Sequence, residues 1–208
     1  MSDSERSDLT FEAIVAGRRS VRRYTDDAVP RDDLLALLDA ARWAPSPHGR
    51  QPWRFAVLTN DAPKQRLAEA MGDEWRRQLA LDGEPDATVQ RRLDLSRLRI
   101  RSAPAIVVPC LYLDELDQYP DAARADAERL MAVQSVGAAI QNMLLAAYRR
   151  GLDSGWMCAP LFCPDVVVGA LGIDVRLIPQ ALITIGYAAA PPPRRPHRPA
   201  EELTVLFD

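Results

Sequence analysis

The chain has 208 residues, of which 48% are hydrophobic and 26% are charged, and its formal net charge is −3. This length predicts one domain, and the mildly acidic balance disfavours general affinity for nucleic acid. Lys64 is the one lysine among 26 lysines and arginines, so 25 are arginines. A P-loop needs glycines before its lysine, and Asp61-Ala62-Pro63 has none. We expect Lys64 to be solvated.

The few cysteines and histidines exclude further classes of protein. Cys110, Cys158 and Cys163 form no Cys-x-x-Cys pair and are odd in number, so neither a zinc ribbon nor a disulfide framework is predicted. His48 and His197 lie far apart, and no metal site is expected. The N-terminus is polar, and no apolar run approaches the ~20 residues that span a bilayer. We therefore predict a cytoplasmic protein with no membrane and no nucleic-acid partner.

Hydrophobic periodicity predicts helices and strands that alternate along the chain. The predicted helices cover residues 9–17, 30–41, 61–79, 86–101, 123–150 and 164–171. The predicted strands cover residues 53–59, 105–113, 154–158, 180–187 and 204–207. With no repeat and no second domain, this order indicates an α+β or α/β class.

The longest predicted helix is apolar nearly all round from Met131 to Ala147. A helix of this kind is buried on several sides, either in the middle of a domain or in an interface. After the last long strand, the proline-rich segment 191–199 is predicted to be extended and semi-rigid.

Three arginine clusters are candidates for binding an anionic, phosphorylated ligand, because guanidinium groups pair with phosphate oxygens. They are Arg18/Arg19/Arg22/Arg23, Arg97/Arg99/Arg101 and Arg194/Arg195/Arg198. In so arginine-rich a chain, a single cluster is more often ordinary surface. The first cluster is the strongest candidate, because it follows a predicted helix and carries Ser20, a suitable phosphate donor.

No catalytic set built from protein side chains is evident. His48 lies in the loop 45–51, where a lone histidine is more often a bystander than an acid or base. Cys158 would need a neighbouring base to act as a nucleophile, so we expect a small core residue or a backbone donor. The tryptophans, Trp156 among them, are predicted to be core residues. If the chain is an enzyme, a bound cofactor is expected to carry the chemistry.

Residues 18–24 (RRSVRRY) and 44–55 (APSPHGRQPWRF) resemble the nitroreductase family of FMN-dependent oxidoreductases. The similarity continues through residues 151–156 and 185–187 to the basic tail, so it covers nearly the whole chain. Within that family, the chain is most similar to the C-terminal nitroreductase-like domain of the bifunctional coenzyme F420:L-glutamate ligase, chiefly at residues 161–167 (LFCPDVV).

The resemblance implies a fold and an assembly. The expected fold is α+β, a three-layer α/β/α sandwich with a mixed central sheet. The expected assembly is an intertwined homodimer with FMN at its interface. Residues 1–208 would form a single FMN-binding domain, in which residues 188–208 are a C-terminal extension that wraps onto the partner subunit.

The resemblance also implies a set of FMN-binding positions. They are Arg18, Arg19, Ser20, Arg22, Pro45, Ser46, Pro47, Gln51, Ser96, Arg99, Cys158, Ala159, Arg195 and His197. Residues 18–20 match the motif that holds the phosphate and ribityl chain, and Arg22 matches the basic residue near the pyrimidine edge of the ring.

The other positions match different parts of the flavin. The loop 45–51 would cover the ring from the other subunit. Ser96 and Arg99 match a polar pair near the pyrimidine end. The backbone N–H of Cys158 or Ala159 would face the flavin N5. Arg195 matches the tail's phosphate clamp, which Arg194, His197 or Arg198 would complete.

The implied activity is hydride transfer through flavin N5, from a reduced nicotinamide, NAD(P)H, to an organic acceptor. The dehydro form of coenzyme F420, a deazaflavin, is one expected acceptor, in F420 biosynthesis. No side chain is expected to be catalytic. The alternatives are a general nitro or quinone reductase, the flavin-fragmenting synthase of dimethylbenzimidazole, and a flavin carrier without enzymatic activity.

Overall fold

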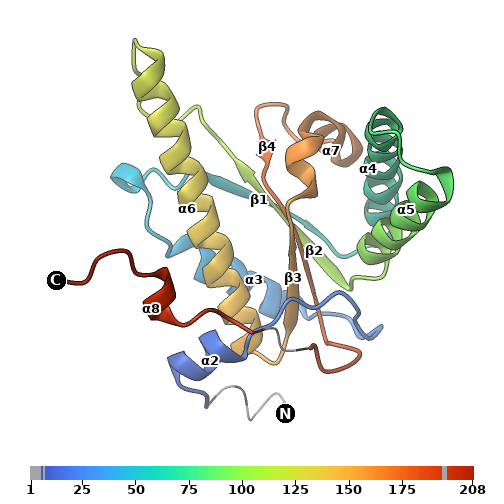
Figure 1. The fold of residues 1–208 in the computed structure, drawn as a ribbon, viewed down its shortest axis with the longest axis horizontal. Helices are drawn as coiled ribbons and strands as arrows, with labels where there is room; N and C mark the ends of the chain where they lie inside the picture. Colours follow the sequence, from blue (N-terminus) through green and yellow to red (C-terminus); the bar gives the residue numbers. More distant parts are fainter. Residues whose placement is uncertain (1–5, 7, 194–195) are drawn as a thin grey trace.

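A central sheet carries the fold, and helices cover both of its faces (Figure 1). The computed structural model describes residue 6, residues 8–193 and residues 196–208. The helices are α2 (Phe11–Gly17), α3 (Arg31–Arg42), α4 (Asp61–Leu81), α5 (Asp86–Arg101), α6 (Ala122–Arg149), α7 (Pro164–Leu171) and α8 (Ala200–Leu203), with 3-10 turns η1 (Pro47–Gly49) and η2 (Ala159–Phe162). The strands are β1 (Trp53–Leu58), β2 (Ala105–Leu111), β3 (Asp153–Met157), β4 (Ile178–Pro179) and β5 (Leu182–Gly186).

The strands follow the order β1-β2-β5-β3, and the short β4 also pairs with β2. Every ladder between these strands is antiparallel, so the expectation of a mixed sheet is wrong. The described residues pair in parallel at one isolated bridge, Ser20 to Ser154. This single bridge is too short a parallel contact to form a strand. Four residues later, Tyr24 forms an isolated antiparallel bridge to Ala188 instead.

The three layers follow from the alternation of side chains along the sheet. In β2, Ala105, Val107 and Leu111 face the layer of α3 and α6. Ile106 and Val108 face the opposite layer, where α4, α5 and α7 pack. Because both faces are covered, β2 is buried along its whole length. The predicted three-layer α+β sandwich is therefore confirmed.

Helix α6 is buried on one side only. Ala132, Ala139 and Met143 pack into the core with no exposed surface, whereas Leu130 and Met131 lie exposed. By length and composition alone α6 could cross a membrane, a criterion that the core helix of a soluble protein also meets. The helix that the sequence predicts to be buried on several sides thus has an apolar side that the single chain leaves uncovered.

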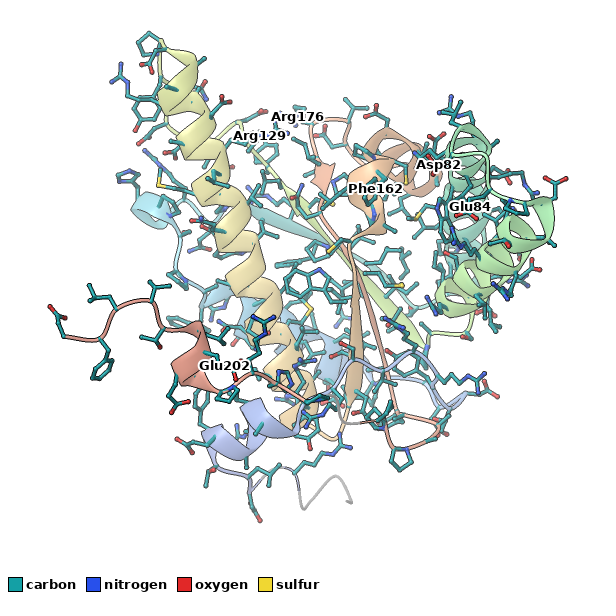
Figure 2. All side chains as sticks on the ribbon, in the orientation of Figure 1. Asp82, Glu84, Arg129, Phe162, Arg176 and Glu202 are labelled. Carbon is teal, nitrogen blue, oxygen red and sulfur yellow. The ribbon has the colours of Figure 1, made fainter. Side chains whose placement is uncertain are left out.

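The C-terminal tail ends away from the body of the molecule, and its side chains project into solvent (Figure 2). The strand predicted over 204–207 is wrong: the last helix is α8, and Thr204 follows it with no strand partner. Val205 and Phe207 are almost completely exposed. A strand needs a sheet edge to pair with, and the described part of the chain offers none here.

Lys64 is buried, with 4% of its surface exposed, so the expectation of a solvated lysine is wrong. Its Nζ donates a hydrogen bond to the Ala103 carbonyl at 3.0 Å and lies 3.1 Å from a carboxylate oxygen of Asp61. The first turn of α4 lies over the turn between α5 and β2, so the side chain reaches a carbonyl there rather than water. Lys64 therefore joins α4 to the end of α5.

Replacing Lys64 by methionine is expected to lower the free energy of unfolding by about 1–3 kcal/mol, because the Ala103 carbonyl loses its donor in a buried place. Urea unfolding measures this loss. Gln65→Met is the matched control, since Gln65 is exposed and its amide donates to Glu69 on its own helix. Equal losses in the two variants would contradict the role given to Lys64.

Candidate functional site

The basic segment that follows α2 is extended and pinned to the sheet. Val21 is buried, whereas Ser20 and Arg22 on either side of it are exposed. The Val21 N–H donates a hydrogen bond to the Ser154 carbonyl of β3 at 2.9 Å. Because side chains alternate along extended backbone, Ser20 and Arg22 point to the same side, away from the core.

A cavity opens on that side. Its lining comes from the basic segment, α5, β3 and β5: Ser20, Val21, Arg22, Arg99, Gly155, Trp156, Met157 and Thr184. Three of the predicted FMN-binding residues, Ser20, Arg22 and Arg99, therefore lie around one cavity, although Arg99 is far from the other two in the sequence.

The cavity is strongly cationic. Burial lowers the pKa of Arg99, and the charge of Arg22 lowers it further, which indicates that the two guanidinium groups lie near each other. Arg18 does not line the cavity; burial and the charge of Arg19 lower its pKa. Among the described residues no ion pair joins Arg18, Arg22 or Arg99 to a carboxylate. Guanidinium groups held together without carboxylates favour an anionic ligand.

Arg19 has a different place. Its guanidinium donates hydrogen bonds to the carbonyls of Ala16 and Arg18, both at 2.6 Å. These carbonyls lie at the C-terminal end of α2, where backbone acceptors lack helical partners. Arg19 therefore closes the helix end, and this contact holds the backbone from which Ser20 and Arg22 project.

The middle arginine cluster contributes only Arg99 to the cavity. Arg97 bonds to Asp73 of α4 at 2.8 Å instead. Ser96 is half-buried on α5 and does not line the cavity. The predicted Ser96/Arg99 pair is thus brought to the site through its arginine alone.

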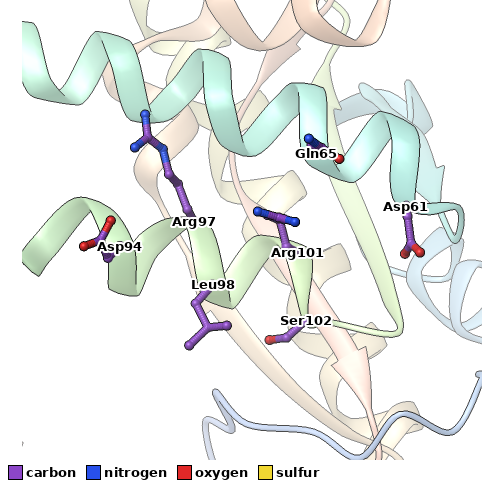
Figure 3. Close-up of a pocket in the computed structure, with 7 residues that line it drawn as sticks. All are labelled: Asp61, Gln65, Asp94, Arg97, Leu98, Arg101 and Ser102. Atoms are coloured by element: carbon purple, nitrogen blue, oxygen red, sulfur yellow. The ribbon is translucent and has the colours of Figure 1, made fainter. Parts of the chain in front are cut away.

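A second, wider groove runs between α4 and α5 (Figure 3). It is lined by Asp61, Gln65, Asp94, Arg97, Leu98, Arg101 and Ser102. The groove carries both carboxylates and arginines, and Arg101 points between the two helices. With both charges present and Arg97 already paired, this groove suits an anion less well than the cavity beside Arg22.

The loop 45–51 lies against α6, away from the basic segment (Figure 1). His48 and Gln51 have left-handed backbones, with φ of 51° and 49°. Ser46 Oγ accepts a hydrogen bond from the Gln51 N–H at 3.0 Å, and His48 Nε2 lies 3.6 Å from Asp117. A single chain therefore does not bring this loop to the cavity. The predicted site residues that stay apart for this reason are Pro45, Ser46, Pro47 and Gln51.

The turn after β3 is exposed at Cys158 and Ala159. Cys158 follows the cavity residue Met157 directly and precedes η2. The other two cysteines, Cys110 and Cys163, are buried. The turn is thus an accessible edge of the cavity.

We expect one fast-reacting thiol in the native protein at pH 8. Burial raises the pKa of Cys110 to about 12 and that of Cys163 to about 11, so neither forms appreciable thiolate, the reactive form. Cys158 is exposed. Ellman's reagent should therefore label one thiol quickly and three after denaturation, and Cys158→Ser should abolish the fast phase. A fast phase that survives in Cys158→Ser would contradict the burial of the other two.

The tail residues are less informative about the site. His197 and Arg198 are exposed. The predicted clamp residue Arg195 and its neighbour Arg194 lie outside the described residues. The phosphate clamp therefore remains a prediction.

The sequence did not predict several of the residues that line the cavity. Trp156, predicted to be a core residue, is 39% exposed and forms part of the cavity wall with Met157. Thr184 comes from the neighbouring strand. The alternation of side chains along the strand could have indicated that Trp156, next to Gly155, faces away from the core. Nothing in the sequence links Thr184 to residues 20–22.

A family model described as the nitroreductase family matches residues 15–187 of the chain. Two curated relatives match over almost their whole length. A Bacillus subtilis (strain 168) protein named as the NAD(P)H nitroreductase YfhC is 24% identical, covering 91% of this chain and 90% of its own. The 5,6-dimethylbenzimidazole synthase of Rhodospirillum rubrum is 30% identical, covering 94% of this chain and 87% of its own.

Among solved structures, a Desulfovibrio desulfuricans protein described as a nitroreductase in complex with FMN is 27% identical. Its TM-score is 0.74, and the match covers 97% of this chain and 98% of that chain. The three-layer arrangement described above is therefore shared with solved relatives over the full domain.

Proposed function

Because the chain belongs to the nitroreductase family, we propose that it is an FMN-dependent NAD(P)H oxidoreductase that reduces nitro or quinone compounds. The observation that carries the proposal is the cavity at which Ser20, Arg22 and Arg99 meet with no carboxylate partner for either arginine among the described residues. Relatives named as NAD(P)H nitroreductases support the nicotinamide as reductant.

The residues present fit an anionic flavin nucleotide. Arg18, Ser20 and Arg22 would supply cationic and hydroxyl donors to it, and Arg99 would face it from α5. Gly155 lets the basic segment pack directly on β3, since an added Cβ there would lie 2.4 Å from the Val21 carbonyl oxygen. When bound, FMN supplies the hydride-transfer chemistry.

The protein's own side chains would bind and orient rather than react. Arg22 and Arg99 would hold positive charge beside the ring, where it stabilises developing negative charge. Trp156 and Met157 would form an apolar wall that limits water. The exposed turn at Cys158 and Ala159 would offer backbone N–H groups to the ring edge.

We further propose that the active form is a homodimer. The loop 45–51 cannot reach its own chain's cavity, and the apolar side of α6 and the tail residues Val205 and Phe207 lie uncovered. A second copy would cover these surfaces and bring its loop and tail to the flavin. Sedimentation or light scattering should therefore give twice the mass of one chain.

The similar proteins do not favour dehydro coenzyme F420 as the electron acceptor. The relatives reported above are a nitroreductase and a dimethylbenzimidazole synthase, and they lend no support to a dehydro-F420 acceptor. A general nitro or quinone acceptor fits them better.

A second candidate function is flavin fragmentation. It is favoured by one observation, the 30% identity with the R. rubrum 5,6-dimethylbenzimidazole synthase. This activity would destroy the flavin under oxygen, whereas a reductase would return it unchanged.

One steady-state experiment tests the proposal and separates the candidates. The purified protein with FMN is mixed with NADH or NADPH, with and without a nitroaromatic or a quinone. A reductase oxidises nicotinamide continuously when the acceptor is present. Progressive loss of the flavin spectrum under oxygen would indicate the synthase, and no turnover in any mixture would contradict both.

A further inference from the structure

Val21, between the two cavity-facing residues Ser20 and Arg22, has both of its backbone polar groups bound. Its N–H donates to the Ser154 carbonyl at 2.9 Å. Its carbonyl accepts from the Tyr24 hydroxyl at 3.0 Å. The backbone beneath the cavity is therefore fixed from β3 on one side and from a tyrosine on the other.

The Tyr24 hydroxyl is itself held by β5. It lies 2.7 Å from Thr184 Oγ1 and 3.2 Å from the Thr184 carbonyl. Burial raises the pKa of Tyr24, so the hydroxyl keeps its proton. When that proton is donated to Val21, the tyrosine oxygen can accept from the Thr184 hydroxyl, which also lies 3.4 Å from the Gly155 carbonyl. A buried hydrogen-bond network therefore links Thr184, Tyr24 and Val21.

The surrounding packing leaves Tyr24 little freedom. An added Cβ on Gly186 would lie 2.9 Å from the tyrosine ring, and one on Gly155 would lie 2.9 Å from Thr184 Oγ1. Both strands thus approach the pair closely, and Tyr24 is 9% exposed. Thr184 lines the cavity at the same time, so the chain of hydrogen bonds ends at the site.

We propose that Tyr24 and Thr184 are positioning residues that hold Ser20 and Arg22 in the geometry needed to bind FMN. The inference depends on the proposed function, because it assumes that FMN occupies this cavity. Neither hydroxyl takes part in chemistry. Each acts through the backbone of Val21, and side-chain groups on a loosely held backbone bind a ligand less well because binding must then order them.

The test compares variants that keep shape and differ by one hydroxyl. Thr184→Val removes the hydroxyl, Thr184→Ser keeps it, and Tyr24→Phe removes the other member. We expect Thr184→Val and Tyr24→Phe to raise the Kd for FMN about tenfold, which corresponds to about 1.4 kcal/mol. The Kd of Thr184→Ser for FMN should lie within about twofold of that of the parent protein, because serine keeps the hydroxyl. If side-chain bulk mattered instead, Thr184→Ser would bind FMN less well, because it loses a methyl group.

Tyr112→Phe is the control for removing a tyrosine hydroxyl, since Tyr112 bonds to Arg176 outside the cavity. Hydrogen exchange of the 20–24 backbone, measured without FMN, reports loosening directly and should be faster in Thr184→Val and Tyr24→Phe alone. Parent-like Kd and exchange in Thr184→Val would overturn the inference. If the parent protein itself does not bind FMN, the proposed function fails first, and unchanged exchange would still refute the positioning role.

Discussion

Replacing Arg22 by alanine is expected to raise the Kd for FMN about tenfold to a hundredfold. Arg22 lines the cavity, carries a full charge and has no carboxylate partner among the described residues. Hydrogen bonds to charged groups contribute about 1.5–3 kcal/mol, and each 1.4 kcal/mol is a factor of ten in Kd. Fluorescence titration of FMN measures the change.

The matched control is Arg23→Ala. Arg23 belongs to the same cluster and is exposed, but it does not line the cavity. The Arg23→Ala substitution removes the same charge as Arg22→Ala. Any loss of FMN affinity that the two variants share therefore reflects the electrostatic field of the whole protein. Equal losses at positions 22 and 23 would mean that the cavity does not hold the flavin.

Replacing Gly155 by alanine is expected to produce the largest loss of stability, about 3 kcal/mol, the upper end of the cost of overpacking. The added Cβ would lie 2.4 Å from the Val21 carbonyl oxygen and 2.9 Å from Thr184 Oγ1. The Val21 carbonyl is part of the backbone and cannot rotate away from the added Cβ as a flexible side chain can. The basic segment must therefore move away from β3. FMN binding should fall with stability, because Ser20 and Arg22 would move as well.

Gly169→Ala is the control for that substitution. Gly169 is exposed on α7, and an added Cβ there meets no atom within 4 Å. Alanine inside a helix is favoured over glycine by about 0.5–1 kcal/mol, so this variant should be slightly more stable than the parent. Thermal and urea unfolding compare the two, and a Gly155→Ala protein as stable as Gly169→Ala would contradict the close packing of residues 20–22 on β3.

The layers of the fold were predictable because they follow from local periodicity. The apolar run at Ala105–Leu111 is buried on both faces, as its composition predicts, and α6 begins and ends within a residue of the predicted bounds. The pairing direction was not predictable, because it depends on which strands meet. The buried position of Lys64 was missed for the same reason, since its acceptor, Ala103, lies 39 residues away.

The candidate site was predictable in part. The arginines at 18 and 22 stand out in the sequence, and Arg99 stands out only as a member of a cluster. Arg22 and Arg99 meet at one cavity only because the fold brings α5 to the basic segment, which no periodicity encodes. Tyr24 ends the RRSVRRY motif, which gives it no role of its own, and Thr184 lies in no motif. Only the fold brings their hydroxyl oxygens to 2.7 Å.

The visible absorption spectrum of the purified protein tests the central claim most directly. We predict a flavin spectrum, release of FMN on heating as identified by mass spectrometry, and a rise in melting temperature when FMN is added to the stripped protein, because a ligand that binds the native state stabilises it. A colourless protein whose melting temperature does not change with saturating FMN would contradict the claim.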